Sequence, residues 1–367
     1  MQTKLKSKKH YIINAVIILL VTALTLFYML KNGIMGQISN LSKIPWTGIV
    51  AIIFIIFISM LFQCYIYHNS NLVADAGLTF SQSANSYFMG FLGSGITPLK
   101  SGHYPFIFYY NAKRNVSFEK SLSIVCLNQI VFSITTIITY LIIMIMCLAK
   151  HTIIVISGTE INLWLAALAG FLFNLGALLL VILMTYCKPF HKLIVKICSF
   201  FLFKFKKIEN REIYEIEHSR KMEIYKKQID YIFKHLYKFL LPILAFFLYL
   251  IFYCSVPYII HLFFTNGTFN LSSYLFFFSL NQAMTYITNI IPVPGGTGVA
   301  EFSFIAIFGT VFSESTVGAA MIIWRLLTYF IPIIATFILF IIIMITSRPK
   351  HRLQQIDIPE TVIKPNQ

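Results

Sequence analysis

Two charged residues lie deep in the most apolar part of the sequence. Arg325 is about nine residues into the apolar run 316–346, so at about 1.5 Å per residue it lies about 14 Å deep, near the bilayer centre. An unpaired charge is costly there, and Glu301 is the only other acidic or basic residue deep in the second half of the chain. We therefore expect the two residues to meet. Their role stays open between a structural ion pair and a direct contact with substrate.

Glu301 lies near the end of a stretch, residues 289–302, that interrupts an apolar segment with two prolines and three glycines. Proline removes amide donors and glycine leaves the helical conformation easily, so a helix cannot run through it. Irregular backbone at membrane depth occurs only where it is buried in protein or faces a wet cavity. The stretch is thus either a binding site or an ordinary loop between two spans. As a site it would offer Gly295, Gly296, Thr297 and Glu301.

A second break covers residues 97–105 and contains side chains that suit an anion: Thr97, Lys100, Ser101 and His103. Helix starts at Pro98 and Pro105 would add amide donors and positive dipole ends, a combination typical of phosphate binding. His103 alone could equally be a hydrogen-bonded packing residue. Together with Arg325, the residues of the two breaks form the predicted substrate-binding set.

Motifs of catalysis are not found in the sequence. It contains no nucleophile and base at a recognisable spacing, no metal-ligand cluster, no P-loop and no dinucleotide fingerprint. The six cysteines occur singly in or beside apolar segments, as packing residues do. We predict no catalytic residues, no metal and no cofactor. An enzymatic role would require that the chain act with a separate catalytic subunit.

The composition indicates where these residues are held. Of the 367 residues, 58% are hydrophobic and 11% are charged, and several apolar runs reach the length of about 20 residues that a membrane helix needs. The formal net charge is +16, but the basic residues flank the apolar runs. Anionic lipid is therefore the expected counter-charge, and nucleic acid is not an expected partner.

We predict an all-α polytopic membrane protein with about six full spans and two re-entrant broken-helix hairpins. The spans are 11–30, 46–67, 118–149, 163–187, 236–264 and 316–346, and the hairpins are 80–110 and 271–312. The excess of Lys and Arg in certain loops places both termini and the basic region 188–235 in the cytoplasm. Within that region, 190–205 suits an interfacial helix, and i,i+4 charge pairs predict a solvated helix after it.

This arrangement has an internal symmetry. The integral membrane domain, 1–349, divides into halves at about 11–149 and 161–346, followed by a short cytoplasmic tail, 350–367. Each half contains two spans, an interrupted hairpin and a further span, and the halves have opposite orientation. Inverted repeats with paired broken helices are a transporter architecture, whose substrate site lies at the breaks near the midplane.

Two motifs carry a resemblance to a known family. The pattern Pro-x-Pro-Gly-Gly-x-Gly-x-x-Glu at 292–301, with Arg-Leu-Leu-Thr-Tyr at 325–329, resembles the lysylphosphatidylglycerol synthase transmembrane-region family of flippase-like membrane proteins. The first break is similar to the other signature of that family through Thr97-Pro98, Ser101-Gly102, Pro105 and Tyr109-Tyr110. His103-Tyr104 departs from the Gly-Gln often found there. The similarity extends from the first span to Thr346.

The resemblance implies lipid handling in a bacterial plasma membrane. Some members are fused to an aminoacyltransferase domain that lysinates phosphatidylglycerol, a domain we do not expect here. The leading hypothesis is a translocase for an anionic or aminoacylated lipid. The alternative is the membrane component of a phosphatidylglycerol lysyltransferase, which confers resistance to cationic peptides. Expected partners are membrane lipids, with a homo-oligomer or a cytosolic lipid-modifying enzyme as further possibilities.

Overall fold

The fold is an all-helical membrane bundle. The computed structural model describes residues 44–149, 153–156, 159–187, parts of 189–199, 210–291 and 293–346. Five helical segments in these ranges are long and apolar enough to cross a bilayer: Trp46–Val73, Phe118–Leu148, Leu163–Leu180, Tyr237–Thr265 and Val317–Thr346. The predicted span 11–30, most of the predicted interfacial helix 190–205 and the tail 350–367 lie outside the described residues. Fold class and multi-pass character are confirmed.

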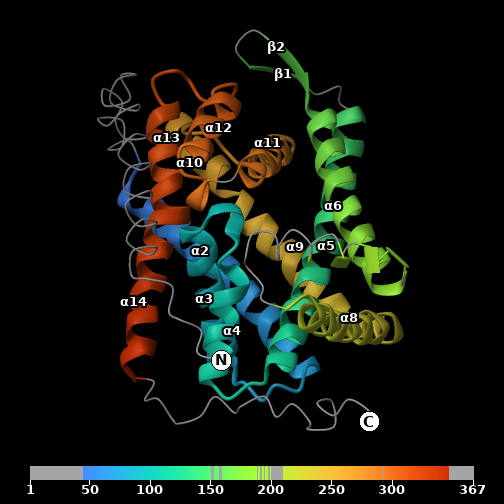
Figure 1. Ribbon diagram of the computed structural model, residues 1–367. Helices are drawn as coiled ribbons and strands as arrows, with labels where there is room; N and C mark the ends of the chain where they lie inside the picture. The colour runs from blue at the N-terminus through green and yellow to red at the C-terminus, as the bar shows by residue number, and fades with distance from the viewer. Residues whose placement is uncertain are drawn as a thin grey trace, which may run out of the picture.

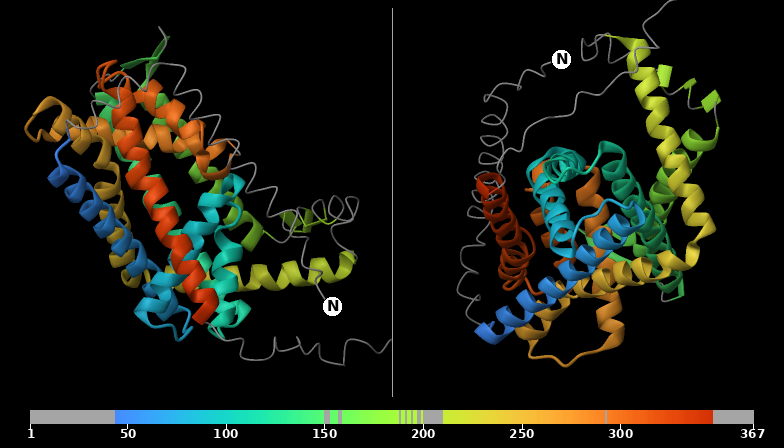
Figure 2. Two further views of the ribbon diagram at one scale, coloured as in Figure 1. Left: turned by 90° about the vertical axis from the view of Figure 1, so that its left-hand side faces the viewer. Right: turned by 90° about the horizontal axis from the view of Figure 1, so that it is seen from below.

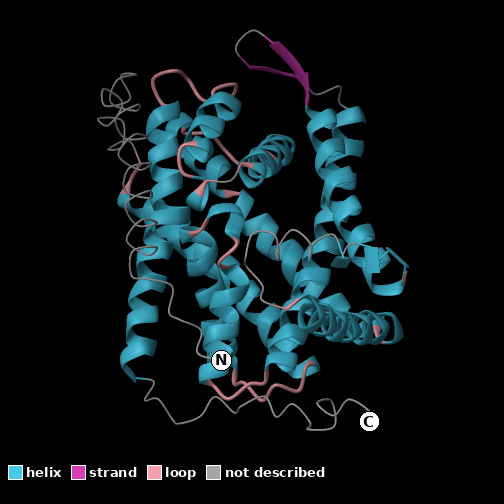
Figure 3. Ribbon diagram, viewed as in Figure 1, coloured by secondary structure: helices cyan, strands magenta, loops and turns pink. Residues whose placement is uncertain are grey.

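The first half contains α2 (Trp46–Val73), α3 (Phe80–Ile96), the short turn η2 (Pro98–Lys100), α4 (His103–Lys113) and α5 (Phe118–Ala149). The connection after α5 forms two short strands, β1 (Ile153–Ile156) and β2 (Thr159–Asn162), which pair in antiparallel and were not predicted. Helix α6 (Leu163–Tyr186) returns through the bundle beside α5. Figure 3 shows the strands at one end of an otherwise helical molecule.

The second half begins with α8 (Arg211–Lys234), the charged helix expected after the basic region, and the turn η3 (Leu236–Phe239). It continues with α9 (Leu240–Cys254), α10 (Val256–Thr265), α11 (Leu271–Ile290), η4 (Pro294–Gly296) and α12 (Val299–Phe308). It ends with α13 (Val317–Arg325), η5 (Leu326–Phe330) and α14 (Ile331–Thr346). In Figure 1, α8 and the β-hairpin lie at opposite ends of the bundle, and Figure 2 shows α8 projecting from it.

Two predicted spans are interrupted in the structure. The segment predicted as one helix over 236–264 is divided at Ser255, just before Pro257, whose ring and missing amide are incompatible with a continuous helix. The last span carries a wide π-type turn at Leu326–Phe330, directly after Arg325. Such turns are frequent at functional sites.

Helix α2 runs opposite to α9 and α10, the direction that the predicted inverted repeat requires of this pair. Gly48, near the start of α2, lies against the ring of Phe263 near the end of α10. Ile66, near the end of α2, packs with Phe246 in α9. Helix α2 and the segment formed by α9 and α10 are therefore antiparallel. Figure 1 shows the α3–α4 hairpin entering from the end that carries α8, and the α11–α12 hairpin entering from the end that carries the strands.

The outer faces of the bundle are apolar. Bulky side chains such as Phe54, Leu172 and Ile338 are 61%, 56% and 53% exposed. Their helices are candidate spans, so these faces suit the hydrocarbon of a bilayer. Polar side chains are instead found inside, including Gln63, Asn281 and Arg325.

Candidate functional site

The two breaks contain turns of the same backbone conformation. Each starts with a proline, Pro98 or Pro294, and the next two residues have positive φ: 51° and 55° for Leu99 and Lys100, 60° and 65° for Gly295 and Gly296. The amides of Ser101 and Thr297 then donate to the carbonyls of the respective prolines, at 3.0 and 3.1 Å. The two turns differ in backbone strain, because glycine adopts positive φ freely whereas leucine and lysine do not.

The breaks meet inside the bundle. The Tyr329 hydroxyl, which lies in the π-type turn, donates to the Gly95 carbonyl at the end of α3, at 2.9 Å. A Cβ atom at Gly295 would lie 1.9 Å from that hydroxyl oxygen and 2.7 Å from the Gly95 carbonyl oxygen. A side chain is thus excluded at Gly295 by the contact between the halves, and the φ of 60° would add backbone strain.

Arg325 and Glu301 form the expected pair. Nε of Arg325 lies 2.6 Å from Oε1 of Glu301, and the two side chains are 8% and 5% exposed. The other carboxylate oxygen accepts from the Gly298 amide at 2.6 Å, at the start of α12. A terminal nitrogen of Arg325 donates to the Gly295 carbonyl at 2.9 Å, and its guanidinium carbon lies 3.9 Å from the centre of the Tyr329 ring. The pair therefore ties the second break to the last span.

A cavity of about 620 Å³ opens between the breaks and the surrounding spans. The first break contributes Leu99 and Lys100 to its wall, and the second contributes Gly295 and Gly296. The other lining residues come from both hairpins, from the turn η5 and from helices α2, α5, α6, α9, α13 and α14. The volume lies in the range of about 300–1,000 Å³ that small-ligand sites occupy, so a lipid headgroup fits it by size.

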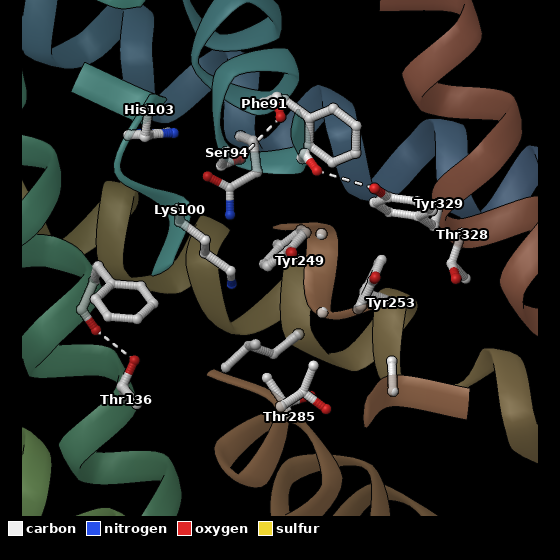
Figure 4. A pocket seen from close by; sticks show the side chains of 18 of the residues that line it. Phe91, Ser94, Lys100, His103, Thr136, Tyr249, Tyr253, Thr285, Thr328 and Tyr329 are labelled. Carbon is white, nitrogen blue, oxygen red and sulfur yellow. Dashed lines mark hydrogen bonds between the residues drawn. The ribbon is translucent and has the colours of Figure 1, made fainter. Parts of the chain in front are cut away.

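Lys100 places a positive charge in the wall of this cavity. Its side chain is exposed to the cavity, and it makes no hydrogen bond or ion pair within the described part of the chain. Figure 4 shows it extending from the break toward the wall that carries Tyr249 and Tyr253. None of the described residues that line the cavity is Asp or Glu. With Arg325 neutralised by Glu301, the described lining has a net positive charge at Lys100.

His103 is held by the protein itself. Its Nε2 lies 2.8 Å from the Tyr67 hydroxyl, and its ring packs edge-on against Tyr104, with centroids 5.1 Å apart. A Cβ atom on Gly90 would lie 2.9 Å from the imidazole ring, so α3 approaches the ring closely. These contacts agree with the interpretation of His103 as a hydrogen-bonded packing residue, although it also lines the cavity.

The structure brings most of the predicted substrate-binding residues to the cavity and leaves the others behind it. The residues that line it are Thr97, Lys100, His103, Gly295, Gly296 and Arg325. Ser101, Thr297 and Glu301 do not line it. Thr97 and Thr297 also have backbone partners, because Thr97 accepts from the Gly102 amide at 2.7 Å and Thr297 donates to the Pro294 carbonyl at 3.1 Å.

Sequence reasoning missed the part of the site that lies on unbroken helices. Gln63 in α2 is 7% exposed, lines the cavity and makes no hydrogen bond with another described residue. Tyr249 and Tyr253 in α9 stack on each other, with ring centroids 5.5 Å apart, and also face the cavity. The available signal was the presence of polar residues within apolar runs, since such residues usually face the bundle interior.

Fold and site together define a polytopic helical membrane protein with two opposed broken-helix hairpins around a central cavity. Residues 12–336 match the family described as Lysylphosphatidylglycerol synthase TM region. The chain belongs to this family, as its motifs predicted. Comparison with curated proteins gave no match.

Proposed function

We propose that the protein is a lipid translocase of the bacterial plasma membrane that moves an anionic or aminoacylated phospholipid between leaflets. The observation that carries this proposal is the cavity between the two breaks, with Lys100 in its wall and no partner for that lysine among the described residues. A cation without a counter-charge at membrane depth is a functional feature by default, because burying it is costly. A phosphate is the natural partner for it.

The arrangement also offers a place for the tails. Phe132 in α5 and Phe173 in α6 line the cavity and are 38% and 60% exposed. An apolar, exposed wall beside a polar one suits a lipid whose headgroup lies inside and whose chains stay in the bilayer. The opposed hairpins provide two elements that can open the cavity to either side in turn, as in other inverted-repeat transporters.

The proposed orientation follows from the distribution of charge. Lys113, Arg114, Lys120 and the charged helix α8 lie at one end of the bundle, where Arg220 of α8 pairs with Glu119 of α5. The positive-inside rule assigns this end to the cytoplasm. The α3–α4 hairpin would then enter from the cytoplasm and the α11–α12 hairpin from outside, with both termini cytoplasmic.

The test is lipid transfer between leaflets of reconstituted vesicles. Tail-labelled fluorescent lipids with several headgroups are exposed to a membrane-impermeant quencher, and vesicles without protein provide the background. The proposal expects faster loss of inner-leaflet fluorescence for at least one anionic or aminoacylated lipid. Equal rates with and without protein for every headgroup would exclude translocation.

The family description favours a second candidate, a membrane component of a phosphatidylglycerol lysyltransferase that acts with a separate cytosolic catalytic subunit. Lipid extracts of cells with and without the gene discriminate between the candidates. Loss of lysinated lipid supports the transferase, whereas an unchanged amount with an altered leaflet distribution supports translocation. A lipid-binding scaffold would change neither quantity.

A further inference from the structure

We infer that the cavity selects a lipid whose headgroup combines a phosphate with hydroxyl groups and contains no amine. This inference rests on the proposed function and narrows its substrate from anionic or aminoacylated lipids to the amine-free anionic ones. It starts from the charges and the unused hydrogen-bonding groups of the cavity wall.

The charge of the wall disfavours a cationic headgroup. Lys100 has no partner among the described residues, and no Asp or Glu occurs in the described lining. Glu301, the acidic residue of the second break, accepts hydrogen bonds from Arg325 and from the Gly298 amide and does not line the cavity. An ammonium group in this space would face the like charge of Lys100 without a carboxylate to compensate it. Such repulsion of the wrong ligand contributes to specificity as much as attraction of the right one.

The position of Lys100 is fixed by its backbone. Both Leu99 and Lys100 have positive φ, a conformation that costs free energy for residues with a side chain. The equivalent turn of the second half carries Gly295 and Gly296 in the same conformation. The first turn therefore keeps a lysine where the second has a glycine, and the cavity receives one cation from only one of its two related walls.

Most of the wall is apolar, and several neutral polar groups lie in it together with Lys100. Gln63 is the clearest of them, because it is only 7% exposed, lines the cavity and has no hydrogen-bond partner among the described residues. It lies one helical turn before Tyr67, which is bonded to His103 beside the first break. An amide both donates and accepts hydrogen bonds, as a hydroxyl group does.

The opposite side of the cavity adds further groups of this type. Gln282 in α11 is 5% exposed and uses its Nε2 in a contact of 3.2 Å with Cys254, which leaves its carbonyl oxygen without a partner in the described chain. Tyr249 and Tyr253 present ring faces and hydroxyl groups on the same side as the end of Lys100 (Figure 4). Uncharged amides and tyrosines around one cation match a phosphate that carries a polyol.

The first experiment compares tail-labelled phosphatidylglycerol, lysylphosphatidylglycerol and phosphatidylethanolamine in the vesicle assay. We expect wild-type protein to transfer phosphatidylglycerol about tenfold or more faster than either amine-bearing lipid, because all three lipids share the phosphate and only the ammonium groups face the like charge of Lys100. Lys100→Gln should remove this preference. Lys113→Gln, at the other end of the same hairpin, serves as the matched control and should retain it. Transfer of lysylphosphatidylglycerol at the rate of phosphatidylglycerol would overturn the inference and leave translocation intact.

The second experiment tests the hydroxyl groups. Phosphatidylmethanol carries the same phosphate diester without a polyol, so wild-type protein should transfer it more slowly than phosphatidylglycerol. Gln63→Leu should bring the two rates together by slowing phosphatidylglycerol. Equal rates for both lipids in the wild-type protein would overturn the hydroxyl part of the inference.

Equilibrium binding separates failure of the inference from failure of translocation. Short-chain phosphatidylglycerol and soluble glycerol phosphate are titrated into the detergent-solubilised protein. Binding of the lipid that is selective against its lysyl ester and dependent on Lys100, without any transfer in vesicles, would support the site and refute the translocase. Binding of glycerol phosphate as tight as that of the lipid would show a site for a soluble anion and refute the lipid. Indifference of binding to Lys100→Gln would overturn the inference under either function.

Discussion

Replacing Glu301 with Gln should destabilise the protein strongly, because it leaves the Arg325 guanidinium buried without its counter-charge. The two side chains are 5% and 8% exposed and 2.6 Å apart, a geometry in which removal of one partner costs about 3–5 kcal/mol. The substituted amide can still accept from the Gly298 amide, so the loss should come from the charge and not from the helix start.

Arg325→Gln should cost at least as much, since it leaves the carboxylate unpaired and also removes the donor to the Gly295 carbonyl. An unpaired buried carbonyl adds about 1–3 kcal/mol. The double substitution removes both charges and should retain mainly that last cost, so it should be far more stable than the sum of the single changes indicates.

Melting temperature in detergent and lipid transfer in vesicles, measured on all three variants, separate structure from function. A structural pair predicts loss of stability in both single variants and recovery in the double variant. If Arg325 instead holds a lipid phosphate, Arg325→Gln should abolish transfer while the fold stays intact, and the double variant should remain inactive. Full transfer by a stable Arg325→Gln protein would refute both versions of the reasoning.

Three further substitutions test the contact between the breaks and the strain in the first of them. Gly295→Ala should reduce both melting temperature and transfer, because the new methyl group would lie 1.9 Å from the Tyr329 hydroxyl oxygen; a normal melting temperature would show that the halves are not in contact there. Tyr329→Phe removes one hydrogen bond to the Gly95 carbonyl and should cost about 1–3 kcal/mol, measured by denaturation, if that carbonyl stays buried, with headgroup preference unchanged. Leu99→Gly should raise the melting temperature, because it relieves about 1–2 kcal/mol of strain at a residue that is 59% exposed and has a φ of 51°; a lower melting temperature would show that the turn gains more from the leucine than it loses.

The sequence indicated the breaks well because their signals are local. Proline and glycine at 292–298 exclude a continuous helix in any surroundings, and the structure has a turn there. The pairing of Arg325 with Glu301 was also predictable, because a deep charge needs a partner and only one was within reach. The domain boundary at 349 and the substrate-binding role of the residues remain predictions.

Features that depend on the packing of distant helices could not be predicted from local sequence signals. Apolar periodicity does not show that Gln63 and Tyr253, on different helices, face the same cavity. The hydrogen bond from Tyr329 to Gly95 joins residues 234 positions apart and depends on how the last span packs against α3. The strands at 153–162 follow from local pairing of a short loop that hydropathy does not resolve.

A structure of the protein in nanodiscs of phosphatidylglycerol tests the central claim most directly. The account predicts density for a headgroup in the cavity, with phosphate oxygens within hydrogen-bond distance of Nζ of Lys100 and acyl chains leaving past Phe132 and Phe173. A cavity that holds only water, or acyl chains in place of a headgroup between the two breaks, would contradict it.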